Sequence, residues 1–195
     1  ELLPSKSCYD LNLDFYKRLH RSITGWPGGK PNSDDKARPE RSEPAKKRVI
    51  ILSPHPDDDV ISMGGTFDRL VSQGHEVHIV YQTSGNIAVN NSDVLKFLEV
   101  ISTAFPNSKY ENKELINILK GNNEILNNSE IRKIAGIIRE KESLSATRFF
   151  GIPDSQVHFL KLPFYETGTV KKNIPSEIDF NITKDIINYI KPHQI

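Results

Sequence analysis

The side chains of this sequence best suited to chemistry gather in one short segment. An imidazole and three carboxylates fall within five positions of the run Ser53-Pro54-His55-Pro56-Asp57-Asp58-Asp59. Three neighbouring acids repel one another unless a cation neutralises their charge. Imidazole and carboxylate, without thiolate, are donors that catalytic zinc and related transition metals accept. The segment therefore indicates a divalent metal site.

A simpler interpretation of the acids stays open. Apolar residues from Ile61 to Val71 recur with helical spacing, and acidic side chains are favoured in the first turn of a helix by its dipole. Asp58 and Asp59 could serve only to start that helix. This interpretation leaves His55 and the two flanking prolines without a role, so we favour the metal site.

The elements around the segment predict where it lies. Val49–Leu52 is a continuous run of β-branched and aliphatic residues, which is typical of a strand buried on both faces. Val77–Tyr81 predicts a second strand, and Gly74 fits the C-cap of the helix between the two. Strand, helix and strand form a βαβ unit with parallel strands. Ligands of open α/β sheets bind beyond the carboxyl ends of the strands, which is where His55 would lie.

The rest of the sequence alternates between helical and strand patterns. This alternation predicts an α/β layered domain with a mostly parallel sheet. Asn107–Asn128 is less regular and predicts a long loop around one short helix. We expect helices over Val94–Ile101 with Ser92 as N-cap, Leu115–Leu119, Ser129–Phe150 and Ile178–Ile190, and strands over Val157–Leu160 and from Gln194.

The first 48 residues differ from the patterned body. Leu11–Ile23 has the spacing of one short amphipathic helix, and no large apolar residue occurs from Pro27 to Arg48. Such a segment cannot bury enough surface to offset its ordering entropy. We therefore expect residues 1–48 to be a linker or N-terminal extension and residues 49–195 to be the folded domain. The chain begins with Glu1 and its only methionine is Met63, so we expect a fragment of a longer protein.

Composition excludes several other classes of protein. The length of 195 residues suits one domain, and 26 Lys and Arg balance 25 Asp and Glu to a net charge of +1. A nucleic-acid-binding surface would need a basic excess. No apolar run approaches the roughly 18 residues of a membrane span. The single cysteine, Cys8, rules out a disulfide within the chain, and with the lack of a signal peptide it favours a cytoplasmic location.

Several motifs together carry a resemblance to a known family. The run Pro54–Asp59, which leads into Gly64-Gly65, resembles the signature of the LmbE/PIG-L-type zinc-dependent de-N-acetylases. The resemblance covers about residues 48–195, and it implies a three-layer αβα Rossmann-like fold that ends incomplete at Ile195. It also implies removal of acetyl groups from N-acetylglucosamine-type sugars. Further motifs are similar to the family's Thr-x-Gly loop, Arg-x-x-Glu helix and Lys-Pro turn: Thr83-Ser84-Gly85, Arg139-x-x-Glu142 and Lys191-Pro192-His193.

The resemblance assigns metal and base roles to the first motif. His55 and Asp58 would bind zinc, and Asp57 would be the general base that acts on the attacking water. The third zinc ligand and the general acid of the family are histidines that would lie beyond Ile195. His193 is the candidate to replace the missing ligand, ahead of His75 and His78, whose spacing on a strand points them to opposite faces.

The resemblance also names residues that would contact the substrate. Arg139 would reach sugar hydroxyls or a phosphate, although an exposed helix cation is the alternative for this residue. Thr83 and Asp59 would also face the substrate, and Asp59 stands where the family more usually has Glu. Glu142 is expected to be a structural partner rather than a catalyst.

A narrower resemblance concerns a fused domain. Residues 53–67, 81–89 and 162–168 are similar to the LmbE-like domain that follows a glucosamine-6-phosphate deaminase domain in Bacteroidetes fusion proteins. This implies a deaminase-like partner domain in the parent chain and a small amino-sugar substrate. A non-catalytic sugar-binding or regulatory module is the alternative. Deamination by this chain itself is disfavoured, because that reaction needs no metal.

Overall fold

The computed structural model describes residues 7–22, 46–106, 113–121 and 128–195. Three parallel strands form the sheet in the order β1-β2-β3: β1 (Arg48–Ser53), β2 (Glu76–Tyr81) and β3 (Val157–Phe159). Gln194 makes a parallel bridge to Val49, and its carbonyl accepts a hydrogen bond of 3.0 Å from the Ile50 amide. The predicted parallel sheet is confirmed, and the strand expected from Gln194 is present only as this single bridge.

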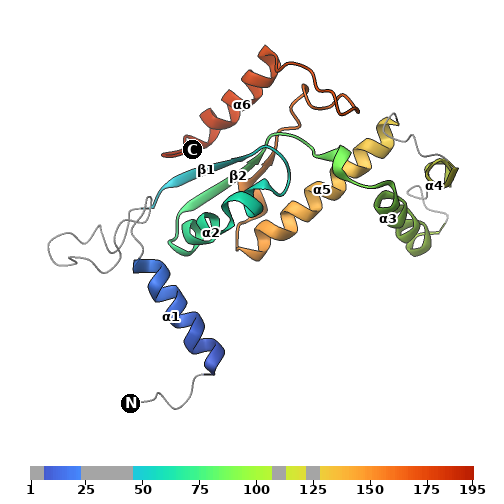
Figure 1. Ribbon diagram of the computed structural model, residues 1–195. Coiled ribbons are helices and arrows are strands. Elements are labelled where there is room, and N and C mark those ends of the chain that lie inside the picture. Colours follow the sequence, from blue (N-terminus) through green and yellow to red (C-terminus); the bar gives the residue numbers. More distant parts are fainter. Residues whose placement is uncertain (1–6, 23–45, 107–112, 122–127) are drawn as a thin grey trace.

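Helices cover both faces of the sheet (Figure 1). Helix α2 (Asp58–Ser72) and helix α5 (Ser129–Phe149) lie on one face, and helix α6 (Glu177–Ile190) lies on the other. Val49 and Ile51 of β1 pack with Phe67 of α2, whereas Ile50 packs with Ile190 of α6. This alternation, in which every second strand residue faces the same layer, produces the three-layer αβα arrangement.

A second core lies away from the sheet. Helices α3 (Asn91–Ala104) and α4 (Lys113–Gly121) pack on the first half of α5, where Leu98, Leu115 and Ile131 are buried together. The predicted helices are therefore confirmed, but Ser92 is not the N-cap of α3. Asn90 has that position, so the helix begins one residue before Ser92. Two short 3-10 turns, η2 (Asn86–Ala88) and η3 (Asp154–Gln156), precede α3 and β3.

The N-terminal part contains the expected helix, α1 (Cys8–Ser22). The predicted linker falls mainly on residues 23–45, which lie outside the described residues. Gly74 follows α2 with a φ of 77°, as a C-terminal glycine of a helix does. Among the described helices, none has the length and apolar character that a membrane crossing requires.

Candidate active site

The loop between β1 and α2 is closed by a buried hydroxyl. Ser53, the last residue of β1, donates a hydrogen bond of 2.7 Å from Oγ to the His55 carbonyl. The same oxygen accepts a hydrogen bond of 3.1 Å from the Asp59 amide in the first turn of α2. Asp58 and Asp59 do occupy that first turn, as the simpler interpretation of the acids requires. The loop therefore holds its acids beyond the carboxyl end of β1, as predicted.

His55 and Asp58 lie side by side at the open end of this loop. Nδ1 of His55 is 3.1 Å from Oδ2 of Asp58, which also accepts a hydrogen bond of 3.0 Å from the His55 amide. The two side chains are 47% and 35% exposed, so both face solvent. Two zinc ligands at about 2.0–2.2 Å from the metal are roughly 3.3 Å apart in a tetrahedron, so this spacing fits one edge of such a site.

The donor pair is not accompanied by a third ligand in the part of the chain that the structure describes. Within those ranges, no group of three or more His, Cys, Asp or Glu side chains is placed to hold a metal. The candidate His193 lies at the other end of β1, where its Nδ1 accepts a hydrogen bond of 2.9 Å from the Arg48 amide. His193 is therefore wrong as a substitute ligand.

Asp57 has a strained backbone next to this pair. Its φ of 124° lies in a region that residues with a side chain rarely adopt. Such strain occurs most often at functional sites, where surrounding contacts maintain it. Here the contact is an ion pair of 2.7 Å between Oδ2 of Asp57 and Nη2 of Arg139 from α5. The same nitrogen also donates to the Pro56 carbonyl.

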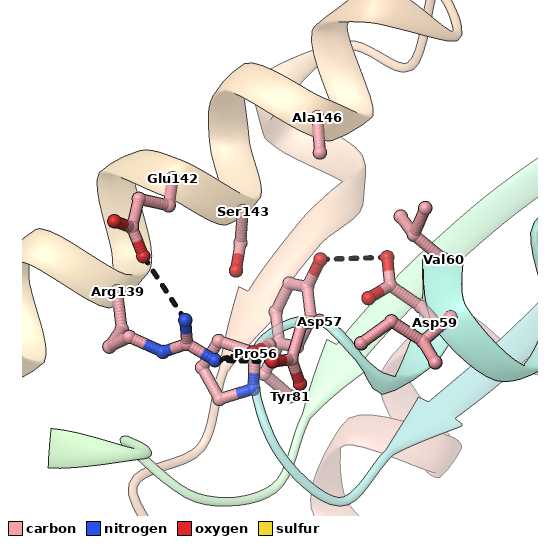
Figure 2. Close-up of a pocket in the computed structure, with 10 residues that line it drawn as sticks. Pro56, Asp57, Asp59, Val60, Tyr81, Arg139, Glu142, Ser143 and Ala146 are labelled. Atoms are coloured by element: carbon pink, nitrogen blue, oxygen red, sulfur yellow. Dashed lines mark hydrogen bonds and ion pairs between the residues drawn. The ribbon is translucent and has the colours of Figure 1, made fainter. Parts of the chain in front are cut away.

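Arg139 is largely buried and forms ion pairs with Asp57 and Glu142, so it is not an exposed helix cation. Its side chain is 19% exposed, and Nη1 lies 3.2 Å from Oε2 of Glu142 (Figure 2). Burial lowers the pKa of Arg139. The neighbouring Asp57 and Glu142 carboxylates raise it by more, so the pKa is above its usual value. Glu142 is a structural partner of the arginine, whereas the contact of Arg139 with substrate stays a prediction.

Asp59 is held in the interior by a tyrosine that the sequence patterns did not single out. Tyr81, at the end of β2, donates a hydrogen bond of 2.8 Å to Oδ2 of Asp59, and each residue is 1% exposed. Oδ1 of Asp59 is buried without a hydrogen-bond partner. Burial raises the pKa of the Asp59 carboxyl, and burial beside Asp59 raises the pKa of the Tyr81 phenol well above its usual range.

The Thr-x-Gly loop (Thr83–Gly85) is hydrogen-bonded to the loop between β1 and α2. Thr83 is buried, and its hydroxyl donates a hydrogen bond of 2.7 Å to the Pro54 carbonyl. Gly85 has a φ of 60°, and a Cβ there would lie 3.0 Å from Cδ of Pro56. Only glycine fits this backbone without strain. In this geometry Thr83 positions the loop, and its predicted contact with substrate remains untested.

The loop that follows β3 lies against the His55 side of the site. The Tyr165 ring meets the His55 ring edge to face, with centroids 5.6 Å apart, and Lys172 Nζ lies 3.7 Å from the centre of the tyrosine ring. Asp179 of α6 accepts a hydrogen bond of 3.0 Å from the Phe164 amide, which fixes the loop to that helix. The resemblance of residues 162–168 singled out this loop, but only the fold brings Tyr165 to His55.

A pocket of about 250 Å³ lies between α2 and α5, beside the loop that joins β1 to α2. Figure 2 shows Asp57, Arg139 and Glu142 on one side of it, whereas Asp59, bonded to Tyr81, lies beside Val60 on the other. Almost all the surface that the pocket exposes is carbon. Its lining residues are Pro56, Asp57, Asp59, Val60, Ile61, Tyr81, Arg139, Glu142, Ser143 and Ala146.

The remaining histidines of the sheet lie apart from this site. His75 is buried just before β2, where its Nδ1 accepts a hydrogen bond of 3.1 Å from the Lys47 amide. His78 of β2 and His158 of β3 stack under α6, on the face of the sheet away from α2. His75 and His78 thus have different partners, the Lys47 amide and the His158 ring.

These features define an α/β domain with a histidine–aspartate pair and a strained acid at the carboxyl end of its first strand. The family model of PIG-L, described as GlcNAc-PI de-N-acetylase, matches residues 50–195. The chain therefore belongs to the PIG-L family, in agreement with the resemblance and the αβα fold.

Two curated relatives narrow the comparison. The chain is 48% identical over 200 residues to a putative glucosamine-6-phosphate deaminase-like protein of Bacteroides thetaiotaomicron, covering 97% of this chain and 30% of that protein. It is 35% identical over 48 residues to diacetylchitobiose deacetylase of Thermococcus kodakarensis, covering 25% of this chain and 18% of the relative. The chain thus spans less than a third of the length of either relative. No solved structure matches the chain significantly.

Proposed function

We propose that this chain is a hydrolase domain that removes the N-acetyl group from an N-acetylglucosamine-type amino sugar. The observation that carries the proposal is the placement of Asp57, strained and clamped by Arg139, directly between the apolar pocket and the His55–Asp58 pair. Membership of a de-N-acetylase family and similarity to a diacetylchitobiose deacetylase support the same class of reaction.

His55 and Asp58 would hold a divalent metal, for which we propose zinc. Their spacing of 3.1 Å and their exposure suit two adjacent ligands, and further donors would come from outside the described residues. When bound, zinc would polarise the amide carbonyl and stabilise the negative charge that develops on its oxygen.

The residues of the chain itself would perform the proton transfer and the positioning. Asp57 would accept a proton from the water that attacks the acetyl carbon. Arg139 holds one oxygen of Asp57 at 2.7 Å, so the other carboxylate oxygen can be directed at the water. The bond between the acetyl carbon and the sugar nitrogen then breaks, acetate leaves, and the nitrogen takes up a proton to leave as an amine. Thr83 and Gly85 would keep the loop in register with Arg139.

We propose further that the domain is fused to a deaminase-like domain in a longer protein. The support is the name and length of the Bacteroides thetaiotaomicron relative, of which this chain covers 30%. In that arrangement residues 1–48 would connect the two domains. Removal of the acetyl group from a sugar would give the free amine on which a deaminase acts, so the two activities would be consecutive.

The test is acetate release from N-acetylglucosamine and from its 6-phosphate by the zinc-loaded protein. We expect release from at least one of the two, and a loss of about 100-fold or more in Asp57→Asn, because a positioned base contributes at least that factor. Asp68→Asn is the matched control, since Asp68 is an exposed acid elsewhere on α2, and it should keep full activity. Zinc binding without acetate release from either sugar would contradict the proposal and favour a non-catalytic sugar-binding module.

A further inference from the structure

The pocket between α2 and α5 is larger than an acetyl group needs. A cavity of about 150 Å³ with apolar walls is enough for benzene, and one water-sized group takes up about 30 Å³. The pocket of about 250 Å³ therefore has room for several carbon atoms beyond the two of an acetyl group.

The exposed charged groups of this pocket and its apolar side chains lie at different ends. Asp57 and Arg139 lie at the end that adjoins the loop between β1 and α2, and Ala146 and Val60 lie away from them (Figure 2). Ile61 also lines the pocket although it is 76% exposed, so it presents an apolar side chain at the opening. A ligand that suits both ends has its reacting polar group near Asp57 and an apolar chain that runs towards Ala146.

Asp59, which lies deeper in the wall of the pocket, is compatible with an apolar ligand. Oδ1 of Asp59 is buried and hardly accessible, so a chain in the pocket would contact mainly carbon atoms. Carbohydrate rings, in contrast, need several hydrogen-bonding partners, and the carbon surface of this pocket offers few of them.

We infer that this pocket binds the acyl chain of the substrate amide and accepts unbranched chains of about four to six carbon atoms, longer than acetyl. The identity of the occupant as an acyl chain rests on the proposed function, because it assumes that the scissile amide lies at Asp57. The sugar then lies outside the pocket, towards the His55 side of the loop, where Tyr165 forms the wall.

The test is a titration of the zinc-loaded Asp57→Asn protein with N-acetyl-, N-butanoyl- and N-hexanoylglucosamine. Methyl NMR of Ala146 and Ile61 gives both the Kd and the location of binding. A fully buried methylene tightens binding about fourfold. Hexanoyl has four more methylenes than acetyl, so even partial burial of them should lower the Kd at least tenfold. The Ala146 and Ile61 methyl resonances should shift only with the longer chains.

Two variants test whether the preference for the longer chain arises in this pocket. Ala146→Leu should fill the far end of the pocket and remove the preference for hexanoyl, while binding of the acetyl compound stays unchanged. Ile61→Ser changes an exposed side chain, so it should leave the fold intact and reduce the same preference. Ala104→Leu, at an exposed position at the end of α3, is the matched control and should behave as the parent does.

The outcomes separate this inference from the proposed function. Equal Kd values for the three compounds, or an unchanged series in Ala146→Leu, would overturn the acyl-chain assignment even if acetate is released from the acetyl sugar. Tighter hexanoyl binding with shifts at Ala146 would support the pocket even if hydrolysis by the unsubstituted protein failed. In that case only the proposed catalytic function would be lost.

Discussion

Two clusters in this molecule pair a histidine with a carboxylate at nearly the same distance. In the loop after β1, His55 lies 3.1 Å from Asp58, and on β2, His78 lies 3.2 Å from Glu76. We refer to them as the loop cluster (His55 and Asp58) and the sheet cluster (Glu76, His78 and His158). Distance between the two partners does not distinguish them, but their surroundings do.

The loop cluster is open, whereas the sheet cluster is occupied by protein contacts. His55 is 47% exposed, and the side chain of His78 is 10% exposed. His78 uses both ring nitrogens, because Nδ1 is 3.1 Å from Nε2 of His158 and Nε2 contacts Glu76. A neutral histidine needs a lone pair that points to the metal, and both nitrogens of His78 already have partners. Exposure at the carboxyl end of a strand is therefore what separates a candidate metal edge from a structural histidine.

The largest effect on catalysis is expected from replacing Arg139, which forms an ion pair with Asp57 beside the loop cluster. Arg139→Ala should lower kcat of deacetylation by about 10- to 100-fold, because Asp57 loses the charged partner that orients it. KM should change much less than kcat. Arg139→Lys should restore part of the rate, since a cation then still reaches Asp57. Equal loss of rate in the Lys and Ala variants would show that charge next to Asp57 is not what matters.

The next effect concerns the glycine that allows the two loops to approach. Gly85→Ala should lower the free energy of unfolding by about 1–3 kcal/mol, because alanine is strained at positive φ and its Cβ would crowd Pro56 at 3.0 Å. Gly74→Ala is the comparison, since Gly74 also has a positive φ, but a Cβ at that position would have no neighbouring atom within 4 Å. Chemical denaturation of both variants should give the larger loss for Gly85. Equal losses would mean that backbone strain alone, and not close approach, sets the requirement for glycine.

A smaller effect should come from the hydrogen bond beneath the loop cluster. Tyr81→Phe removes the donor to Oδ2 of Asp59, which leaves the buried carboxyl with neither oxygen paired to a side chain. Loss of one partner of a buried polar group destabilises a protein by about 1–2 kcal/mol. Thermal unfolding measures this, with Tyr189→Phe on the exposed side of α6 as a control. A Tyr81→Phe protein as stable as its parent would argue against this bond as a support of the loop.

The smallest expected effect is the change of stability with pH. It has opposite signs for Asp59, below the loop cluster, and for His158 of the sheet cluster. The pKa of Asp59 is raised in the folded state by burial, so its contribution to stability is full below its unfolded value of 3.8 and decreases as pH rises through the raised pKa. The pKa of His158 is lowered by burial and by the neighbouring His78, so its contribution is full above 6.5 and decreases as pH falls towards the lowered pKa.

Two substitutions measure these opposite slopes. Relative to the parent, Asp59→Asn should gain stability as pH is raised from 4 to 7, and His158→Gln should gain stability as pH is lowered from 7 to 5. Urea denaturation at several pH values gives both differences. If the two differences changed in the same direction with pH, the assignment of opposite burial effects would be wrong.

The elements of the fold were predictable because they depend on local patterns. The apolar run Val49–Leu52 became β1, and the spacing within Ile61–Val71 became α2, with only their ends displaced. The N-cap of α3 was missed by two residues, since Asn90 and Ser92 are equally good capping residues in sequence.

The contacts of the site were less predictable, because they depend on how distant segments pack. The pair of Asp57 and Arg139 joins residues 82 positions apart, and no local pattern reports it. Tyr81 was assigned only to a strand, and its bond to Asp59 follows from the register of β2 beside β1. His193 was predicted wrongly because its position in the Lys-Pro-His motif does not reveal that this turn packs at the amino end of β1, away from His55.

The central claim is that the loop cluster, and not the sheet cluster, forms the metal edge of this domain. Zinc binding measured by competition with a chromogenic chelator tests it in three proteins: the parent, a His55→Gln, Asp58→Asn variant and a Glu76→Gln, His78→Gln variant. We predict that the first variant loses stoichiometric zinc binding and that the second retains the Kd of the parent. Retained binding in the first variant, or loss in the second alone, would contradict the account.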